Sequence, residues 1–297
     1  MRIGTRASRL ALAQAKIAVR ALADLAGLDA LEVVPITTRG DAISARQPRG
    51  RFVDTDGQFT RELERALLDR RVDLVVHSLK DLPTAPVHGL VIGAVLERAD
   101  ARDCLLTTDG GGLDDLPFGG RIGTSSPRRA AQLAVARSDL IATPIRGNVE
   151  SRLRRLESGE YDGLILAAAG LDRLGTPVPA KARLPFELML PAPGQGALAL
   201  QVRADDEVLR TSLAAVDHRP TRVAVEAERA LLRHIGGGCL APLGALGEVE
   251  GTILRLRAAF EDASGGFIRA AADGPIDDVA TVVARVAEHV MAAAASA

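Results

Sequence analysis

The strongest constraint on the fold of this chain is an internal repeat. Three segments near the N-terminus return further along the chain in the same order: 2–5 (RIGT) as 121–124 (RIGT), 38–41 (TRGD) as 145–148 (IRGN), and 72–76 (VDLVV) as 161–165 (YDGLI). In each copy, short apolar strands alternate with amphipathic segments of helical spacing, at 60–69 and at 149–157. This alternation is typical of βαβ units. We therefore predict two similar α/β lobes that face one another across a cleft.

The residues that follow the strands differ between the copies. Ligands of open α/β sheets bind beyond the carboxyl ends of the strands, so these residues are expected to line the cleft. Strand 74–76 is followed by HSLKD (77–81), whereas the matching strand 164–166 is followed by a run of alanines. Lysine occurs at only three positions, and one of them is Lys80, beside Asp81. We interpret Lys80 and Asp81 as a functional pair in preference to the alternative, a solvated loop pair that contributes little stability.

The second copy supplies cations to the same cleft. Arginine side chains and helix N-termini both bind carboxylates or phosphates, so several of them around one cleft predict a polyanionic ligand. One helix is expected to begin at Pro127, with Ser125 or Ser126 as its cap. Arg154 and Arg155 are expected to be solvated. The candidate cations are Arg6 from the first lobe and Arg128, Arg129, Arg146, Arg152 and Arg173 from the second.

The last third of the chain predicts a small α+β domain. A helix is expected at about 221–235, strands around 254–260 and 266–271, and a closing amphipathic helix with Ile276, Val279, Val283, Val286 and Val290 on one face. Three glycines at 236–238 precede Cys239. Glycine permits positive φ and close backbone approach, so this turn would display the thiol at the mouth of the cleft. The alternative is that Cys239 packs as a small apolar side chain, which is our assignment for Cys104.

The composition favours small partners in a reducing compartment. The formal net charge of −1 gives no electrostatic basis for binding nucleic acid or an anionic membrane surface. Two cysteines are too few for a disulfide framework, and no apolar run is long enough to span a membrane. The N-terminus opens into a strand-like segment and does not resemble a secretory signal. We expect a cytoplasmic protein that binds a small molecule, uses no metal and works as a monomer.

Six short motifs follow one another along the chain: 2–6 (RIGTR), 77–81 (HSLKD), 123–129 (GTSSPRR), 146–148 (RGN), 193–196 (PGQG) and 236–239 (GGGC). Each motif alone is weak, but six in this order resemble the porphobilinogen deaminase family, whose members are also called hydroxymethylbilane synthases. The resemblance implies an α/β fold of two lobes similar to type II periplasmic binding proteins, followed by a smaller α+β domain. The implied domains are 1–97 with 197–216, then 98–196, then 217–297. The chain would return to the first lobe near 198–203.

The resemblance implies a transferase of tetrapyrrole (haem) biosynthesis. Such an enzyme condenses four porphobilinogen molecules head to tail, releases ammonia at each step, and hydrolyses the product to linear hydroxymethylbilane. Growth would start from a dipyrromethane cofactor that a thioether joins to Cys239 and that the enzyme assembles from its own substrate. Each pyrrole carries an acetate and a propionate arm, which accounts for the arginines. A covalent anchor needs an accessible turn more than a strongly activated thiol.

The motifs also imply roles for individual residues. Asp81 would stabilise the cation that forms when the aminomethyl nitrogen leaves as ammonia, and would assist proton transfers, with Lys80 beside it. The implied cofactor-binding residues are Cys239, Ser78, Lys80, Thr124, Ser126, Arg128, Arg129, Arg146 and Gly196. The implied substrate-binding residues are Arg6, Ser8, Phe59, Arg146, Arg152, Arg173 and Gln195.

One segment departs from the family pattern. Many members have a mobile loop rich in glycine and lysine that leads into a phenylalanine, whereas this chain has RFVDTDGQF at 51–59, with Asp54 and Asp56 in place of lysines. Either Arg49 or Arg51 replaces the missing lysines from a shifted position in the loop, or the loop serves only as a lid. The aspartates leave open a rival reading, a catalytically impaired homologue. A second rival is a two-lobed anion-binding protein, which would need neither an acid in the cleft nor a displayed thiol.

Overall fold

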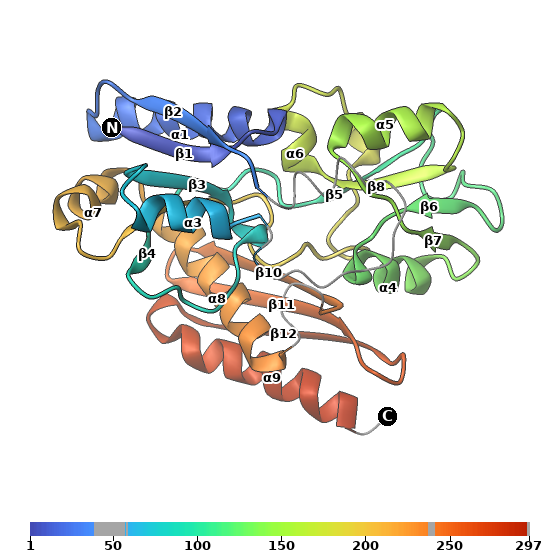
Figure 1. The fold of residues 1–297 in the computed structure, drawn as a ribbon. Coiled ribbons are helices and arrows are strands. Elements are labelled where there is room, and N and C mark those ends of the chain that lie inside the picture. Colours follow the sequence, from blue (N-terminus) through green and yellow to red (C-terminus); the bar gives the residue numbers. More distant parts are fainter. Residues whose placement is uncertain (39–56, 58, 237–240, 296–297) are drawn as a thin grey trace.

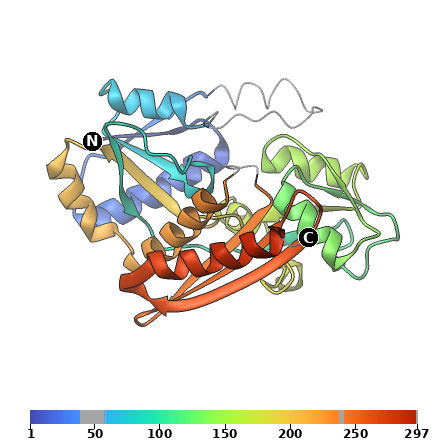
Figure 2. The same ribbon diagram turned by 90° about the horizontal axis from the view of Figure 1, so that it is seen from below.

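Two α/β lobes and a third domain packed against both make up the molecule (Figure 1). The computed structural model describes residues 1–38, 57, 59–236 and 241–295. In Figure 1 the first lobe is mainly blue to teal, with its later helix α7 in gold, the second lobe is green to yellow-green, and the C-terminal domain is orange to red. Seen from below, the C-terminal helix and sheet lie across the base of the two lobes (Figure 2). None of the helices in the described part of the chain is long and apolar enough to cross a membrane.

The first lobe is built on a five-stranded sheet with the order β2-β1-β3-β9-β4. Its strands are β1 (Arg2–Arg6), β2 (Glu32–Ile36), β3 (Leu74–Ser78), β4 (Leu90–Val95) and β9 (Leu198–Arg203), and its helices are α1 (Arg9–Ala26), α3 (Arg61–Leu68) and α7 (Glu207–Leu213), with short 3-10 turns at η1 (Leu79–Asp81) and η3 (Ala214–Val216). Strand β9 reaches this sheet from the second lobe and runs antiparallel to both β3 and β4.

The second lobe repeats this topology with a four-stranded sheet of order β5-β8-β6-β7. Its strands are β5 (Asp103–Leu106), β6 (Arg121–Gly123), β7 (Ile141–Thr143) and β8 (Gly163–Ala167), and its helices are α4 (Pro127–Ala136), α5 (Val149–Glu157) and α6 (Ala168–Arg173), with a 3-10 turn at η2 (Ala180–Ala182). Strand β5 arrives from the first lobe and runs antiparallel to β8, as β9 does to β3.

The repeated segments make the same contacts in both lobes. The amide of Arg2 donates to Asp73 Oδ2 at 2.8 Å, and the amide of Arg121 donates to Asp162 Oδ2 at 2.7 Å. The prediction of two similar α/β lobes is therefore confirmed. A sheet in which one antiparallel strand arrives from the opposite lobe is the arrangement of type II periplasmic binding proteins, as the resemblance implies.

The two crossover segments between the lobes lie side by side and are tied to the C-terminal domain. The amide of Ala99 donates to the carbonyl of Gly196 at 3.2 Å. The fully buried Glu228 accepts hydrogen bonds from Arg98 Nη1 at 2.6 Å and from the amides of Gly194 and Gly247, both at 2.7 Å. One carboxylate thus joins both crossovers to the third domain, and its buried charge is compensated by hydrogen bonds.

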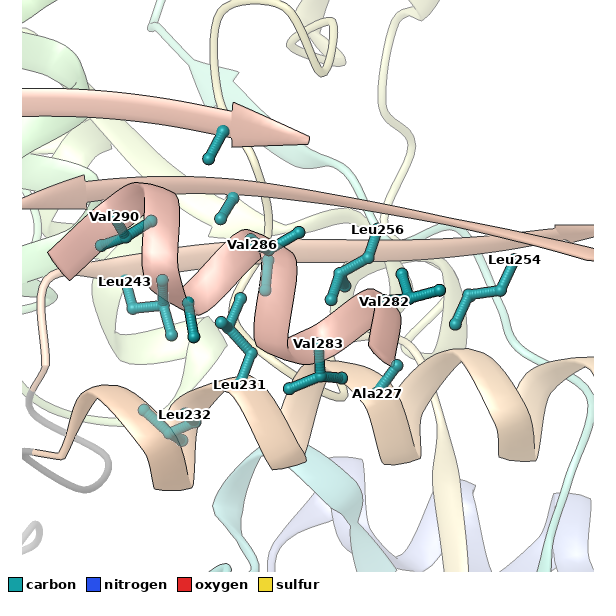
Figure 3. Close-up of a cluster of buried hydrophobic side chains, with 14 residues drawn as sticks. Ala227, Leu231, Leu232, Leu243, Leu254, Leu256, Val282, Val283, Val286 and Val290 are labelled. Atoms are coloured by element: carbon teal, nitrogen blue, oxygen red, sulfur yellow. The ribbon is translucent and has the colours of Figure 1, made fainter. Parts of the chain in front are cut away.

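The C-terminal domain packs two helices on an antiparallel sheet of order β10-β11-β12. Its elements are α8 (Arg219–Ile235), β10 (Leu243–Glu250), β11 (Ile253–Glu261), β12 (Phe267–Pro275), η5 (Ile276–Asp278) and α9 (Val279–Ala295). Figure 3 shows its core, in which Leu231 of α8, Val286 of α9 and Leu256 of β11 converge. The predicted α+β domain is confirmed, and β10 is a strand that the sequence did not predict.

Two glycines explain why the sequence did not predict strand β10. A Cβ atom on Gly247 would lie 2.7 Å from the carbonyl oxygen of Ala224 in α8, and one on Gly244 would lie 2.9 Å from Leu190. The strand approaches its neighbours so closely that only glycine fits at these two positions. Glycine lowers the strand propensity, so the residues that allow the packing also weaken the pattern.

Candidate active site

The turn that follows β3 carries Lys80 and Asp81. The turn η1 begins with a hydrogen bond from the amide of Leu79 to the carbonyl of Ala197, at 3.1 Å. Leu79 is buried beneath the turn, whereas Asp81 is exposed. The pair therefore stands at the carboxyl end of a strand, as the sequence predicts.

Lys80 is connected to the second lobe through Gln195. Lys80 Nζ lies 3.3 Å from Gln195 Oε1, and Gln195 Nε2 donates to the carbonyl of Ala101 at 2.8 Å and to Asp103 Oδ1 at 2.9 Å. Burial lowers the pKa of Lys80 to about 8, although the attraction of Asp81 acts in the opposite direction. Lys80 is therefore a cation at neutral pH that gives up its proton more readily than an ordinary lysine.

A pocket between the lobes, which we name the interlobe pocket, lies beside this turn. It is lined by Leu10, Gln14, Ser78, Lys80, Asp81, Arg129, Val149, Arg152, Leu166, Ala167, Ala169, Gly170, Arg173, Gly196 and Ala197. Four of these residues are cations, and among the described residues that line the pocket Asp81 is the one acid. Such an excess of positive charge fits a ligand with several carboxylates.

A second pocket, which we name the first-lobe pocket, adjoins the interlobe pocket. It is lined by Arg6, Ser8, Leu10, Ala11, Gln14, Phe59, Thr60, Leu63, Val76, His77, Ser78 and Asp81. The Arg6 guanidinium lies 4.0 Å from the centre of the Phe59 ring, and Ser8 caps α1 by accepting from the amide of Ala11 at 3.3 Å. Asp81 lines both pockets, so a single carboxylate can reach a ligand in either one.

Arg128 and Arg129 converge on one carboxylate, Asp103. Asp103 Oδ2 lies 2.8 Å from Arg128 Nη1, and Asp103 Oδ1 accepts from Arg129 Nη2 at 2.7 Å. Arg128 also donates to the carbonyl of Leu190 at 2.6 Å, and Arg129 to that of Ile165 at 2.9 Å. Burial alone would raise the pKa of Asp103, but the two guanidiniums hold it well below its ordinary range. Two cations share one anion, so a net positive charge remains.

Arg152 and Arg173 are held in the interlobe pocket by backbone carbonyls. Arg152 Nε donates to the carbonyl of Gly147 at 2.9 Å, and Arg173 Nη2 donates to that of Gly196 at 2.6 Å. Burial lowers the pKa of both guanidiniums to about 10. Among the described residues, neither forms an ion pair with a carboxylate. Their charge is therefore available to a ligand.

Five predicted site residues in the described part of the chain line neither pocket: Thr124, Ser126, Arg128, Arg146 and Gln195. Ser126, and not Ser125, is the cap of α4, and it accepts from the amide of Arg129 at 3.4 Å. Thr124 Oγ1 accepts from the amide of Ser126 at 3.2 Å. Arg146 is half-buried between β7 and α5. Thr124, Ser126 and Arg128 lie at the start of α4, and Arg146 precedes α5, whereas Gln195 contacts Lys80, which lines the interlobe pocket.

The expectation that Arg154 and Arg155 are both solvated is half wrong. Arg154 is exposed. Arg155 is half-buried, because its Nε donates to Glu160 at 2.7 Å and its guanidinium lies 5.1 Å from the centre of the Tyr161 ring. Helical spacing could not reveal these partners, which follow the end of the helix.

Sequence reasoning missed two residues of the site. Gln14 is buried, donates to Ser78 Oγ at 2.8 Å and lines both pockets. Its only signal in the sequence is a glutamine at the matching position of the second copy, Gln132. Asp103 opens the otherwise apolar strand DCLL, and a carboxylate at the start of a buried strand needs cations nearby.

Two sets of predicted residues fall outside the described part of the chain. Cys239 lies between the described Gly236 and Ala241. Arg49 and Arg51 lie in the segment 39–56.

The residues of the interlobe pocket fit a group that carries several carboxylates. In the described part of the chain, the buried Nε atoms of Arg129 and Arg173 have no hydrogen-bond partner. Unpartnered guanidinium nitrogens beside a cavity are suited to carboxylate oxygens. A dipyrromethane, with the acetate and propionate arms of two pyrroles, supplies such oxygens.

The structure combines two α/β lobes around a cleft, four cations in that cleft, and a turn that carries Lys80 and Asp81 beside them. This combination defines a class of enzyme that binds and transforms a polycarboxylate between its lobes. Residues 1–211 match the sequence model described as "Porphobilinogen deaminase, dipyromethane cofactor binding domain", and residues 223–292 match the "Porphobilinogen deaminase, C-terminal domain". The chain belongs to the porphobilinogen deaminase family. The family and the dipyrromethane cofactor indicated by the motifs are thereby confirmed.

Relatives of this family are similar to the chain over nearly its full length. The porphobilinogen deaminase of Desulforudis audaxviator is 46% identical over 276 residues, which cover 93% of this chain and 89% of the relative. That of Thermus thermophilus is 45% identical and covers 93% and 90%, and that of Acidothermus cellulolyticus is 47% identical and covers 99% and 89%. Among solved structures, the Escherichia coli periplasmic aliphatic sulphonate binding protein SsuA is 13% identical with a TM-score of 0.41, covering 78% of this chain and 69% of that one.

Proposed function

We propose that this chain is a hydroxymethylbilane synthase that condenses four porphobilinogen molecules onto a covalent dipyrromethane, releases ammonia at each step, and hydrolyses the product to linear hydroxymethylbilane. The observation that carries the proposal is the position of Asp81 at the junction of the interlobe and first-lobe pockets. Membership of the porphobilinogen deaminase family supports it. The enzyme is a transferase of tetrapyrrole biosynthesis.

Asp81 carries the chemistry in this proposal. The substrate becomes a cation when its aminomethyl nitrogen leaves as ammonia, and a carboxylate beside the pyrrole N–H stabilises that charge. Asp81 is exposed at the pocket junction, so it reaches the substrate and assists the proton transfers. Lys80 lies on the same turn, where its positive charge orients a ligand carboxylate.

In this proposal, each of the two pockets binds a different ligand. Lys80, Arg129, Arg152 and Arg173 in the interlobe pocket hold carboxylates of the dipyrromethane and of the growing chain, while Arg6, Ser8 and Phe59 in the first-lobe pocket receive porphobilinogen. Cys239 would hold the dipyrromethane, which would supply a nucleophilic pyrrole carbon for attachment of the first substrate. Supporting cofactor contacts are assigned to Ser78, Thr124, Ser126, Arg128, Arg146 and Gly196, and a further substrate contact to Gln195.

The remaining assignments concern organisation. The proposed domains are 1–97 with 197–216, 98–196 and 217–297, a division supported by β9 joining the first sheet. We propose a cytoplasmic location, which the low count of two cysteines supports, and no binding to nucleic acid or membrane, which the net charge of −1 supports. We further propose that the chain works as a monomer.

The intact mass of the purified, denatured chain tests this function, because a thioether survives denaturation. The expected result is an excess of two condensed pyrrole units that is lost in Cys239→Ser, with turnover of porphobilinogen that is nearly abolished in Asp81→Asn. A parent chain that stays unmodified after incubation with porphobilinogen would favour an anion-binding protein. A modified parent without turnover would favour an impaired homologue.

A further inference from the structure

Helix α8 of the C-terminal domain has two functional faces. Ala227 and Leu231 point into the core of its own domain (Figure 3). Arg222, Val225 and Arg229, spaced three and four residues apart, lie on another face and contact the first lobe. The helix therefore connects the core of one domain to the backbone of another.

Arg229 holds the backbone of the turn that carries Asp81. Its guanidinium donates to the carbonyls of Leu82 at 2.7 Å, of Pro83 at 2.8 Å and of Leu79 at 3.4 Å. Arg229 is only 8% exposed. Three carbonyls that bracket Asp81 thus converge on one buried cation, and hydrogen bonds with a charged partner are the stronger kind.

The turn η1 is too short to fix its own position. It contains one internal hydrogen bond, from the amide of Leu82 to the carbonyl of Leu79 at 3.2 Å, and the following Pro83 has no amide hydrogen to donate. Val225, one helical turn before Arg229, packs in the same apolar cluster as Leu79 and Leu82. Helix α8 therefore supports the turn from behind by both packing and hydrogen bonds.

We propose that Arg229 is a positioning residue for Asp81, so that the C-terminal domain sets the position of the carboxylate in the cleft. This inference deepens the proposed function and rests on it. All three of these hydrogen bonds end on backbone carbonyls, so through them Arg229 holds Asp81 by way of the backbone of the turn. A displacement of the acid by about 1 Å is enough to cost on the order of 100-fold in rate.

The test compares Arg229→Met with Arg222→Met. Arg222 lies on the same face of α8 and donates to Asp217 at 2.7 Å and to the carbonyl of Gly93 at 3.1 Å, but it makes no hydrogen bond to η1. Both variants remove a guanidinium between the same two domains. The measurements are kcat and KM for porphobilinogen, the intact mass, and the midpoint of thermal unfolding, with activity normalised to the chains that carry the two pyrrole units.

The expected result is that kcat of Arg229→Met falls by roughly 10- to 100-fold with little change in KM, while Arg222→Met lowers the unfolding midpoint and keeps the kcat of the parent. Arg229→Lys should recover part of the rate, because an ammonium can donate to the same carbonyls. Equal kcat losses in the two Met variants, or a change confined to KM, would overturn the proposal. If Arg229→Met does not fold, the same measurements on Arg229→Lys and Arg222→Lys test the proposal. A parent without turnover would instead refute the proposed function.

Discussion

Replacing Asp103 with Asn should destabilise the second lobe, because two buried guanidiniums share this one carboxylate. Asp103 is fully buried, and Arg128 and Arg129 are 3% and 8% exposed. Leaving a buried charge without its partner costs about 3–5 kcal/mol. Both arginines keep a backbone carbonyl, from Leu190 and Ile165, so we expect a loss within this range and not twice as large.

The loss should depend on pH with a definite sign. The guanidiniums lower the pKa of Asp103 far below the value of about 4 that it has in the unfolded chain. A group with a lowered folded pKa contributes stability that is present above its unfolded pKa and is lost as the pH falls through its folded pKa. The difference between the parent and Asp103→Asn should therefore be complete at neutral pH and begin to shrink below about pH 4.

Urea unfolding followed by far-UV circular dichroism measures this difference, since the chain has no tryptophan and a single tyrosine. Asp277→Asn is the control: its side chain is 86% exposed and lies 3.5 Å from Arg219, so its removal should cost less than about 1 kcal/mol. A loss in Asp103→Asn no larger than that of the control would refute the reasoning. So would a larger loss that stays constant between neutral and acidic pH.

Three further outcomes are expected. Arg152→Leu should impair chain extension or assembly of the covalent group more than Arg154→Leu, because Arg152 lines the interlobe pocket and Arg154 does not; equal effects on turnover and on intact mass would contradict this. Gly196→Ala should lower the free energy of unfolding by at least about 1–3 kcal/mol, measured with urea, because the residue has φ of +90° and an added Cβ would lie 2.5 Å from the carbonyl oxygen of Ala99. Turnover should fall above about pH 8, where Lys80 loses the charge that holds carboxylates of the growing chain, and a pH profile of Lys80→Arg should lack this fall.

The repeat allowed two similar α/β lobes to be predicted, because equivalent residues in the two copies have the same structural role. Asp73 and Asp162 occupy the same place in the two copies and accept the same backbone hydrogen bond. The position of Lys80 and Asp81 was also predictable, since strand ends of α/β sheets gather at one edge. Both predictions needed only local pattern and fold logic.

Partnerships between distant segments were not predictable in this way. Asp103 becomes a part of the site only because α4 brings two arginines to it from 25 and 26 residues further on. Arg229 lies on the helix predicted at about 221–235, but nothing in the sequence indicates that its guanidinium reaches the carbonyls of Leu82 and Pro83. Such roles depend on how whole domains pack, which a local pattern does not contain.

The cations of the cleft face two opposing requirements. A buried guanidinium without any partner is costly, yet a guanidinium fully paired with a protein carboxylate has little left to offer a ligand. Backbone carbonyls meet both requirements for Arg152 and Arg173, because a carbonyl holds the side chain in place without neutralising it. Arg128 and Arg129 meet them by sharing Asp103, which leaves one positive charge between them. The protein's own groups thus leave a net positive charge around the cleft, and a ligand with many carboxylates gains more from it than one with a single carboxylate.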